Sequence, residues 1–370
     1  MNQSRSYSSK MEINLSAIRH NCTVCIETAG VPVMAVIKAN AYGFGAIPVA
    51  GACAEAGISS FAVARLEEGL ELREAGFAQD ILIFALMNTD ELEQAVAAGL
   101  SVSLNRIEQI ETLNNLALRI GYSPKIHLKI DTGMSRFGFL PEELPDVIER
   151  IRKARAIQIE GVYSHYANID DDPEDALNAL QKKRFDSALS LLQNAGIRPR
   201  WIHFTNSAAV FNSPASHYTL IRIGNGLLGV NPFYYQDFPP YLEKALTWTT
   251  QLISVRKIPA GAGVGYAQHE TLAEDSWIGV VPVGYGDGYR RVPGNEVLIR
   301  GKRVPVIGSV CTDVMMVKLP EKMEAGEEVV LIGRQGNESI DIEMLADRWL
   351  TARADVTSGI SDRVARTYVN

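Results

Sequence analysis

Residues 33–45 read VMAVIKANAYGFG, and the rest of the chain is organised around this stretch. Its first part, Val33 to Ile37, is short, uncharged and rich in β-branched residues, which is typical of a strand buried on both faces of a parallel α/β sheet. Lys38 follows at the carboxyl end of this strand, and Tyr42 and Gly43 lie where a loop would turn away. Partial burial lowers the pKa of a lysine and favours the neutral amine that attacks a carbonyl to form a Schiff base. Lys38 is thus a candidate nucleophile, although a lysine ending a strand is more often simply solvated.

A unit of short apolar strand, loop and amphipathic helix repeats from the lysine strand onward. Eight strands alternating with helices predict a (β/α)8 TIM-type barrel, which takes roughly 250 residues. The other seven predicted strands are 61–64, 81–85, 101–104, 126–130, 157–165, 201–204 and 219–223.

Beyond the proline pair at 239–240 the pattern changes to β-rich runs broken by glycine turns, with little helix before Met344 and a strand-like tail at 364–369. This predicts a C-terminal, mostly β domain. We therefore expect a polar N-terminal tail at 1–10, a barrel at 11–240 that opens with a strand outside the repeat at 11–15, and the β domain at 241–370.

The composition favours a small-molecule substrate. A net charge of −7 without a basic stripe argues against nucleic-acid binding. Residues 1–10 lack the apolar segment of a signal peptide, and no run is long enough to span a membrane, so we expect a cytoplasmic protein without a membrane segment. Cys22 and Cys25 form a C-x-x-C with no second pair and no metal-type histidine spacing, which favours two small helix residues and no metal.

Several polar residues fall at the carboxyl ends of the predicted strands, where barrels of this kind carry out their chemistry. The loops after strands seven and eight commonly form a phosphate site in such barrels, and Ser207 and Gly224 lie there. A phosphate-bearing cofactor that forms an imine with lysine is pyridoxal phosphate. Around the same end of the barrel the chain places Lys38, Tyr42, Lys129, Arg136, His165, Asn206, Arg222 and Asn225.

Each of these residues has an ordinary alternative. Arg222 could be an ion-pair residue. His165 differs, because its flat ring ends a strand beside the proposed cofactor ring and could stack on it. The other histidines are interpreted as core residues; they are His20, His127, His203, His217 and His269.

These residues resemble the alanine racemases, pyridoxal-phosphate enzymes with a (β/α)8 barrel and a C-terminal β domain. The resemblance runs from Met11 to Tyr368 and is most specific at the lysine motif, Val36 to Gly45. The further matching motifs are 129–134, Arg136, 164–165, 206–209, 265–266, 283–289 and 311–313.

The resemblance implies a two-base racemisation of a small amino acid, which would supply D-amino acids for cell-wall precursors. Lys38 would carry the cofactor and act as one base, and Tyr266 would act as the other from the partner subunit of a homodimer with shared active sites. Arg222 would face the pyridine nitrogen, His165 would lie against the ring, and Arg136 would lie near the substrate carboxylate. Tyr42, Ser207 and Gly224 are expected around the phosphate, and Asn206 and Asn225 are further expected cofactor-binding residues. Tyr285 and Thr312 are expected near the substrate, and Lys129 matches a position that can carry a carbamate.

The chain departs from the family pattern mainly in the β domain. Asp362 stands where the family usually has a tyrosine close to phosphate and substrate. A short carboxylate there would open the pocket and accept a hydrogen bond from a substrate hydroxyl, so we expect serine to be racemised as well as alanine. An exposed Asp362 with no part in the pocket, and hence a strict alanine racemase, is the alternative. Other departures are Phe44, Asn225 and the residues Ser309-Val310 before Cys311-Thr312-Asp313.

Three other functions fit parts of the pattern. A non-catalytic pyridoxal-phosphate carrier needs no second base, so Tyr266 and the β domain argue against it. A fold-related amino-acid decarboxylase would place an acidic residue where this chain has Arg222. A barrel acting on sugar phosphates would leave Tyr266 and the lysine motif unexplained.

Overall fold

The computed structural model describes residues 9–268 and 270–370, so most of the predicted tail at 1–10 and His269 lie outside the described residues. The chain forms two compact units. The barrel unit comprises residues 17–41 and 46–243, and the β unit comprises the described residues up to Ser16 together with 42–45 and 244–370. Within the described residues, no helix has the length and apolar character needed to cross a membrane.

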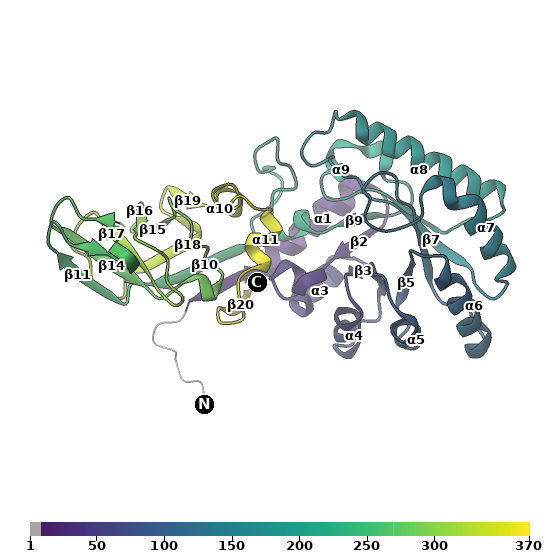
Figure 1. Cartoon of the computed structure of the whole chain (residues 1–370), viewed down its shortest axis with the longest axis horizontal. Coiled ribbons are helices and arrows are strands. Elements are labelled where there is room, and N and C mark those ends of the chain that lie inside the picture. The colour runs from purple at the N-terminus through teal and green to yellow at the C-terminus, as the bar shows by residue number, and fades with distance from the viewer. Residues whose placement is uncertain (1–8, 269) are drawn as a thin grey trace. The chain divides into compact units, whose positions relative to one another are not determined.

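Eight parallel strands form the barrel in the spatial order β8-β7-β6-β5-β4-β3-β2-β9 (Figure 1). The outer two strands approach each other through Thr219 N, which donates to Ile202 O at 3.1 Å, and Arg222 N, which donates to Thr205 O at 3.2 Å. The predicted (β/α)8 barrel is confirmed. Its strands are β2 (Val33–Val36), β3 (Ser60–Val63), β4 (Asp80–Ile83), β5 (Ser101–Leu104), β6 (Ile126–Lys129), β7 (Ile159–Tyr163), β8 (Trp201–His203) and β9 (Ile221–Ile223).

Helices α4 to α8 surround these strands (Figure 1). Each presents an apolar face to the sheet, as α6 does with Ile110, Leu113 and Ala117 buried at helical spacing. The helical segments are α1 (Leu15–Ala29), α3 (Ala46–Glu55), α4 (Leu66–Glu74), α5 (Thr89–Ala97), α6 (Glu108–Ile120), η1 (Pro141–Glu143), α7 (Leu144–Lys153), α8 (Ala176–Asn194), α9 (Ala209–Asn212), η2 (Pro214–Ser216) and η3 (Asn225–Leu228).

A largely antiparallel ten-stranded sheet forms the β unit in the order β11-β14-β17-β16-β15-β18-β10-β1-β20, with β19 beside β18. Burial alternates along β17, where Met315, Val317 and Leu319 face the core. The predicted β-rich C-terminal region is confirmed. The strands of the ten-stranded sheet are β1 (Lys10–Asn14), β10 (Leu246–Gln251), β11 (Ser254–Ile258), β14 (Ser276–Val281), β15 (Glu296–Ile299), β16 (Lys302–Ile307), β17 (Met315–Leu319), β18 (Glu328–Gln335), β19 (Glu338–Ile340) and β20 (Ala365–Val369). A separate two-stranded sheet consists of β12 (Gly263–Val264) and β13 (Glu270–Thr271).

Two helices lie near the end of the chain, around Met344 and after it, where the sequence pattern leaves room for helix. Helix α10 (Ile342–Trp349) ends because Leu350 adopts a left-handed conformation at φ 52°, and α11 (Arg353–Ser358) follows. The two remaining short turns of this unit, η4 (Tyr266–Gln268) and η5 (Tyr285–Asp287), carry two predicted site residues.

Candidate active site

Lys38 follows β2 directly and begins a left-handed turn, α2 (Lys38–Tyr42). The φ angles of Ala39, Asn40, Ala41 and Tyr42 lie between 50° and 54°. None of these residues is glycine, and a left-handed conformation costs a residue with a Cβ about 1–2 kcal/mol. The turn therefore depends on the surrounding structure to hold it.

Glu68 supplies part of that support. Its carboxylate accepts hydrogen bonds from the backbone N–H groups of Ala39 (2.5 Å), Ala64 (2.7 Å) and Arg65 (2.9 Å). One side chain on α4 thus links the ends of β2 and β3. Glu68 is not among the residues predicted from the sequence, although a glutamate at the third position of a helix is a known capping signal.

The environment of Lys38 favours the neutral amine. Burial lowers the pKa of its ammonium group, the positive charge of Arg136 lowers it further, and Glu68 acts in the opposite direction. A larger fraction of neutral amine at a given pH makes Lys38 a better nucleophile towards a carbonyl carbon.

Arg222 on β9 is 4% exposed and lies among neutral acceptors. Its Nη1 donates to His203 Nδ1 and His203 O, both at 2.9 Å. Its Nη2 donates to Ser164 O (2.8 Å), Phe204 O (3.2 Å) and His165 Nδ1 (3.2 Å). The terminal N–H groups are thus committed to the protein, whereas Nε–H has no acceptor among residues 9–268 and 270–370. This leaves one donor of the guanidinium for a ligand.

Several charged side chains of the barrel act on the ring of His165. Burial lowers the pKa of this imidazole well below its usual value, and so do the nearby charges of Arg222, Lys129, Arg136 and Lys38. Four predicted site residues from different strands and loops therefore act on one ring, which stays neutral.

The loop that carries Arg136 is organised by Asp131. Its Oδ1 accepts from the backbone N–H groups of Gly133 (2.9 Å), Met134 (3.0 Å) and Ser135 (3.1 Å), and its Oδ2 accepts from that of Arg136 (3.1 Å). Desolvation of Asp131 raises the pKa of its carboxyl, but these four bonds prevail and lower it. This organising role of Asp131 was not predicted from the sequence, although an aspartate two residues before a glycine favours a turn held by its side chain.

Lys129 at the end of β6 is 7% exposed, and its Nζ lies 4.8 Å from the centre of the Tyr163 ring. Burial lowers the pKa of Lys129 well below its usual value, and Arg222 lowers it further. Gly138 packs against it, since a Cβ on Gly138 would lie 2.6 Å from Lys129 Cγ. Burial and the charge of Arg222 thus favour the neutral amine of Lys129.

The loops after β8 and β9 meet at Ser207, whose hydroxyl accepts from Gly224 N at 3.0 Å. Asn225 begins the short helix η3, so its N–H and that of Gly226 have no acceptor within that helix. Asn206 caps α9 by accepting from Ala209 N at 3.0 Å. These groups provide N–H and O–H donors at one place in the barrel unit, as an anionic phosphate would require.

The remaining candidate residues lie in the β unit. Tyr42 falls in its segment 42–45, one residue after the barrel unit's Ala41. Tyr266 is 67% exposed in η4, on the short connection between β12 and β13. Gly265 precedes Tyr266 and has a positive φ of 73°. A side chain at this position would be crowded, since its Cβ would lie 3.0 Å from Met316 Cε, so glycine suits this turn.

Tyr285 and Thr312 form a pair within the β unit. Thr312 Oγ1 donates to Tyr285 Oη at 2.6 Å, and Gly286 N donates to Thr312 O at 2.9 Å. Asp362 is instead almost fully exposed, with its side chain 99% accessible and 3.3 Å from Arg366 Nη1. An exposed ion pair of this kind contributes little to stability. Asp362 could therefore exchange this contact for another one at little cost to the fold.

Of the five histidines interpreted as core residues, His20 is exposed, so that interpretation is wrong for His20, whose Nε2 lies 3.1 Å from Tyr241 O. His127, His203 and His217 are buried. However, His203 is hydrogen-bonded to Arg222, and His127 is hydrogen-bonded to His203. Neither hydrogen bond was predicted from the sequence.

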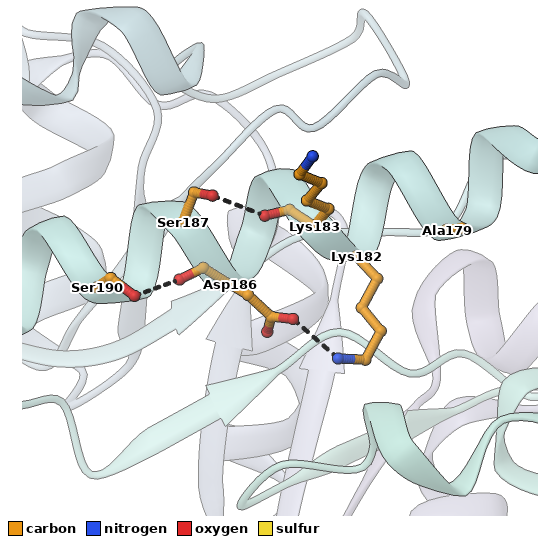
Figure 2. Close-up of a pocket in the computed structure, with 6 residues that line it drawn as sticks. All are labelled: Ala179, Lys182, Lys183, Asp186, Ser187 and Ser190. Atoms are coloured by element: carbon orange, nitrogen blue, oxygen red, sulfur yellow. Dashed lines mark hydrogen bonds and ion pairs between the residues drawn. The ribbon is translucent and has the colours of Figure 1, made fainter.

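An open surface pocket on α8 contains none of the candidate residues (Figure 2). Lys182 pairs with Asp186 at 2.9 Å, and the hydroxyls of Ser187 and Ser190 donate to carbonyls one turn earlier. Lys182, Ser187 and Ser190 thus have bonding partners on α8 itself, so we interpret the pocket as a solvated face of this helix. Within the described part of the chain, no group of three or more potential metal ligands occurs.

Comparisons with known proteins agree with this geometry. Residues 13–232 match the family model "Alanine racemase, N-terminal domain", and residues 245–368 match "Alanine racemase, C-terminal domain". The alanine racemase of Symbiobacterium thermophilum is 39% identical to this chain, and the alignment covers 96% of each of the two chains. The alanine racemase of Carboxydothermus hydrogenoformans is also 39% identical, and the alignment covers 97% of this chain and 98% of the relative. The crystal structure of the alanine racemase of a D-cycloserine-producing Streptomyces lavendulae superposes with a TM-score of 0.92 at 31% identity, covering 98% of this chain and 97% of that one.

Proposed function

The chain belongs to the alanine racemase family, and from this premise we propose that it binds pyridoxal 5'-phosphate in its barrel and racemises alanine and serine. Two observations carry the proposal: the half-buried Lys38 has a lowered pKa, and Arg222, whose charge acts with that of Lys38 on His165, has an Nε–H without a protein acceptor among the described residues.

The barrel residues fit this cofactor. Lys38 would bind its carbonyl carbon, His165 would lie against its ring, and Arg222 would donate from Nε to its pyridine nitrogen. Tyr42, Asn206, Ser207, Gly224 and Asn225 would surround its phosphate. When bound, the cofactor withdraws electrons from the substrate Cα and so makes the Cα hydrogen acidic.

Arg222 limits how far that withdrawal goes. Burial lowers the pKa of its guanidinium to about 10, which still leaves it charged at neutral pH. A guanidinium does not readily release its proton, so the pyridine nitrogen would accept a hydrogen bond and stay unprotonated. A weaker electron sink suits proton exchange at Cα and discourages competing reactions.

Racemisation needs a proton to leave one face of Cα and another to arrive on the opposite face. We assign the first base to Lys38, whose environment favours the neutral amine. We assign the second to Tyr266 of the partner subunit in a homodimer. The 67% exposure of Tyr266 in the single chain leaves its hydroxyl available for such a contact.

Arg136 would bind the substrate carboxylate, and the pair Tyr285 and Thr312 would line the side-chain pocket. Asp362 would accept a hydrogen bond from the hydroxyl of serine. The D-amino acids formed would supply cell-wall precursors.

Lys129 would carry a carbamate. A neutral amine adds CO2 and releases one proton, and burial and the charge of Arg222 favour the neutral form of Lys129. The carbamate would add a negative charge near the cations Arg222 and Arg136.

The test is to measure kcat and KM of the purified protein with pyridoxal phosphate, for both enantiomers of alanine and of serine. We expect turnover of both amino acids in both directions. Inactivity towards alanine would refute the proposed function, whereas strict preference for alanine would refute only the role of Asp362.

A further inference from the structure

A chain of buried polar groups runs down the barrel interior from Arg222. Arg222 Nη1 lies 2.9 Å from His203 Nδ1, and His203 Nε2 lies 2.9 Å from His127 Nδ1. His203 is 0% exposed and His127 is 2% exposed. Neither histidine belongs to the set proposed to touch cofactor or substrate.

The hydrogen bonds fix the direction of this chain. A guanidinium can only donate, so His203 Nδ1 must accept and its proton must sit on Nε2. His203 Nε2–H then donates to His127 Nδ1, which leaves the proton of His127 on its own Nε2. By the same rule His165 Nδ1 accepts from Arg222 Nη2, so three imidazoles share one tautomer.

Burial keeps these rings neutral. It lowers the pKa of His127 to about 3 and that of His203 well below its usual value, and the charge of Arg222 contributes to both shifts. In the part of the chain that the structure describes, no carboxylate forms an ion pair with Arg222. Arg222 is thus held by groups that orient its charge without neutralising it.

The barrel interior is shaped around the two rings. A Cβ on Gly161 would lie 2.2 Å from His127 Nδ1, so the absence of a side chain at this position makes room for that ring. Tyr163 stacks on His203, with ring centres 4.9 Å apart and planes 8° apart. The hydroxyl of Tyr163 is bonded to Ser103 Oγ at 2.7 Å, and Ser103 donates to Ile83 O. The backbone at Gly161 thus packs against the ring of His127, and Tyr163 packs against that of His203.

We propose that His203 and His127 are positioning residues, which hold the Arg222 guanidinium in one orientation as a full cation and leave its Nε–H to a ligand. Rotating the guanidinium would break its bonds to His203, Ser164 and His165 together. The inference rests on the proposed function, because the cofactor would be the acceptor for Nε–H.

The first test is spectroscopic and needs no turnover. The six histidines are labelled with 15N in the full chain, with and without pyridoxal phosphate, and each resonance is assigned by a His→Asn variant. At pH 7 we expect His127, His165 and His203 to be neutral with the proton on Nε2. An Nδ1–H tautomer or an imidazolium at His203 would overturn the proposal.

The second test compares His203→Phe, His203→Asn and His217→Phe. Phenylalanine keeps a ring beside Tyr163 but removes both bonds, whereas the asparagine oxygen can still accept from Arg222. His217 is the matched control, since it is a buried histidine bonded to the carbonyls of Ala29 and Val210 at 3.1 Å.

We expect His203→Phe to lower kcat for alanine about tenfold or more, with a smaller change in KM, and to shift the absorption maximum of the bound cofactor. His203→Asn should retain more activity, and His217→Phe should leave the spectrum unchanged. Wild-type kcat and spectrum in both His203 variants would refute the positioning role. A wild-type protein that neither binds the cofactor nor racemises alanine would instead refute the proposed function, while the tautomer measurement would still decide the hydrogen-bond chain.

Discussion

Single carboxylates that accept several backbone N–H groups decide where the functional side chains of the barrel unit lie. Asp131 accepts four such bonds and shapes the loop that carries Arg136, and Glu68 accepts three and supports the turn after Lys38. Neither residue needs to touch the substrate. Both act by fixing backbone, which makes their roles separable from chemistry by experiment.

Asp131→Asn should raise KM for alanine several-fold with a smaller effect on kcat. The new amide nitrogen cannot accept from Arg136 N, so the loop loses the bond nearest the residue expected to bind the substrate carboxylate. Steady-state kinetics measure this. Asp175→Asn is the matched control, because Asp175 also accepts a backbone N–H, from Leu177 at 2.8 Å, but carries no site residue. Equal KM values in the wild type and Asp131→Asn would contradict the assignment.

The same substitution has a defined pH dependence. The folded-state pKa of Asp131 is lowered, so its carboxylate stabilises the fold above pH about 4 and loses that effect as the pH falls through the lowered value. The difference in unfolding free energy between the wild type and Asp131→Asn should therefore be about 2 kcal/mol at neutral pH and should vanish in acid. Urea titrations at several pH values measure it. A difference that grows towards acid would contradict this sign.

Glu68→Gln should weaken cofactor binding about tenfold, because an amide accepts through one oxygen only and the turn after Lys38 loses support. Fluorescence titration with pyridoxal phosphate measures the dissociation constant. Glu67→Gln changes the exposed neighbouring glutamate and serves as the control. Unchanged affinity in Glu68→Gln would show that the turn holds without this carboxylate.

At the scale of elements, the strands were predictable and much of their chemistry was not. Most barrel strands are short buried runs rich in apolar residues, and the carboxyl-end rule located Lys38, Lys129, His165 and Arg222 without coordinates. The left-handed turn was not predictable, because residues 39–42 contain no glycine to signal positive φ. The contact of Glu68 with Ala39 and that of His203 with Arg222 were missed because each joins different segments of the chain, and sequence does not state such contacts.

The packing of β6 against β7 gives an element-scale prediction. Gly161→Ala should lower the free energy of unfolding by about 1–3 kcal/mol, because the new methyl group would overlap the His127 ring. Gly51→Ala in α3 is the control, since no atom lies within 4 Å of its added Cβ and alanine favours helix. Chemical denaturation measures both variants. A Gly161→Ala protein as stable as the wild type would show that the interior is not tightly fitted around His127.

For the molecule as a whole, the predicted membership in the alanine racemase family is confirmed by matches over residues 13–232 and 245–368. The proposed division of labour places one base in each unit, Lys38 in the barrel unit and Tyr266 in the β unit. If the second base comes from the partner subunit, the two bases of one active site belong to different chains.

Subunit mixing tests this arrangement. Lys38→Ala and Tyr266→Phe homodimers should each be nearly inactive, but unfolding and refolding an equimolar mixture should restore about a quarter of wild-type activity. Half of the dimers would then be mixed, and each mixed dimer would contain one site with both bases. Each variant refolded alone is the control, and no recovery in the mixture would contradict a shared site.

Two-base racemisation is tested most directly by incubating the protein and pyridoxal phosphate with L-alanine in deuterated water. Chiral chromatography follows the chirality of the alanine, and NMR follows the deuterium at its Cα. The account predicts D-alanine that carries deuterium at Cα, and a Tyr266→Phe variant that loses turnover unequally in the two directions. Deuterium exchange into L-alanine without inversion by the wild type, or full activity in Tyr266→Phe, would contradict it.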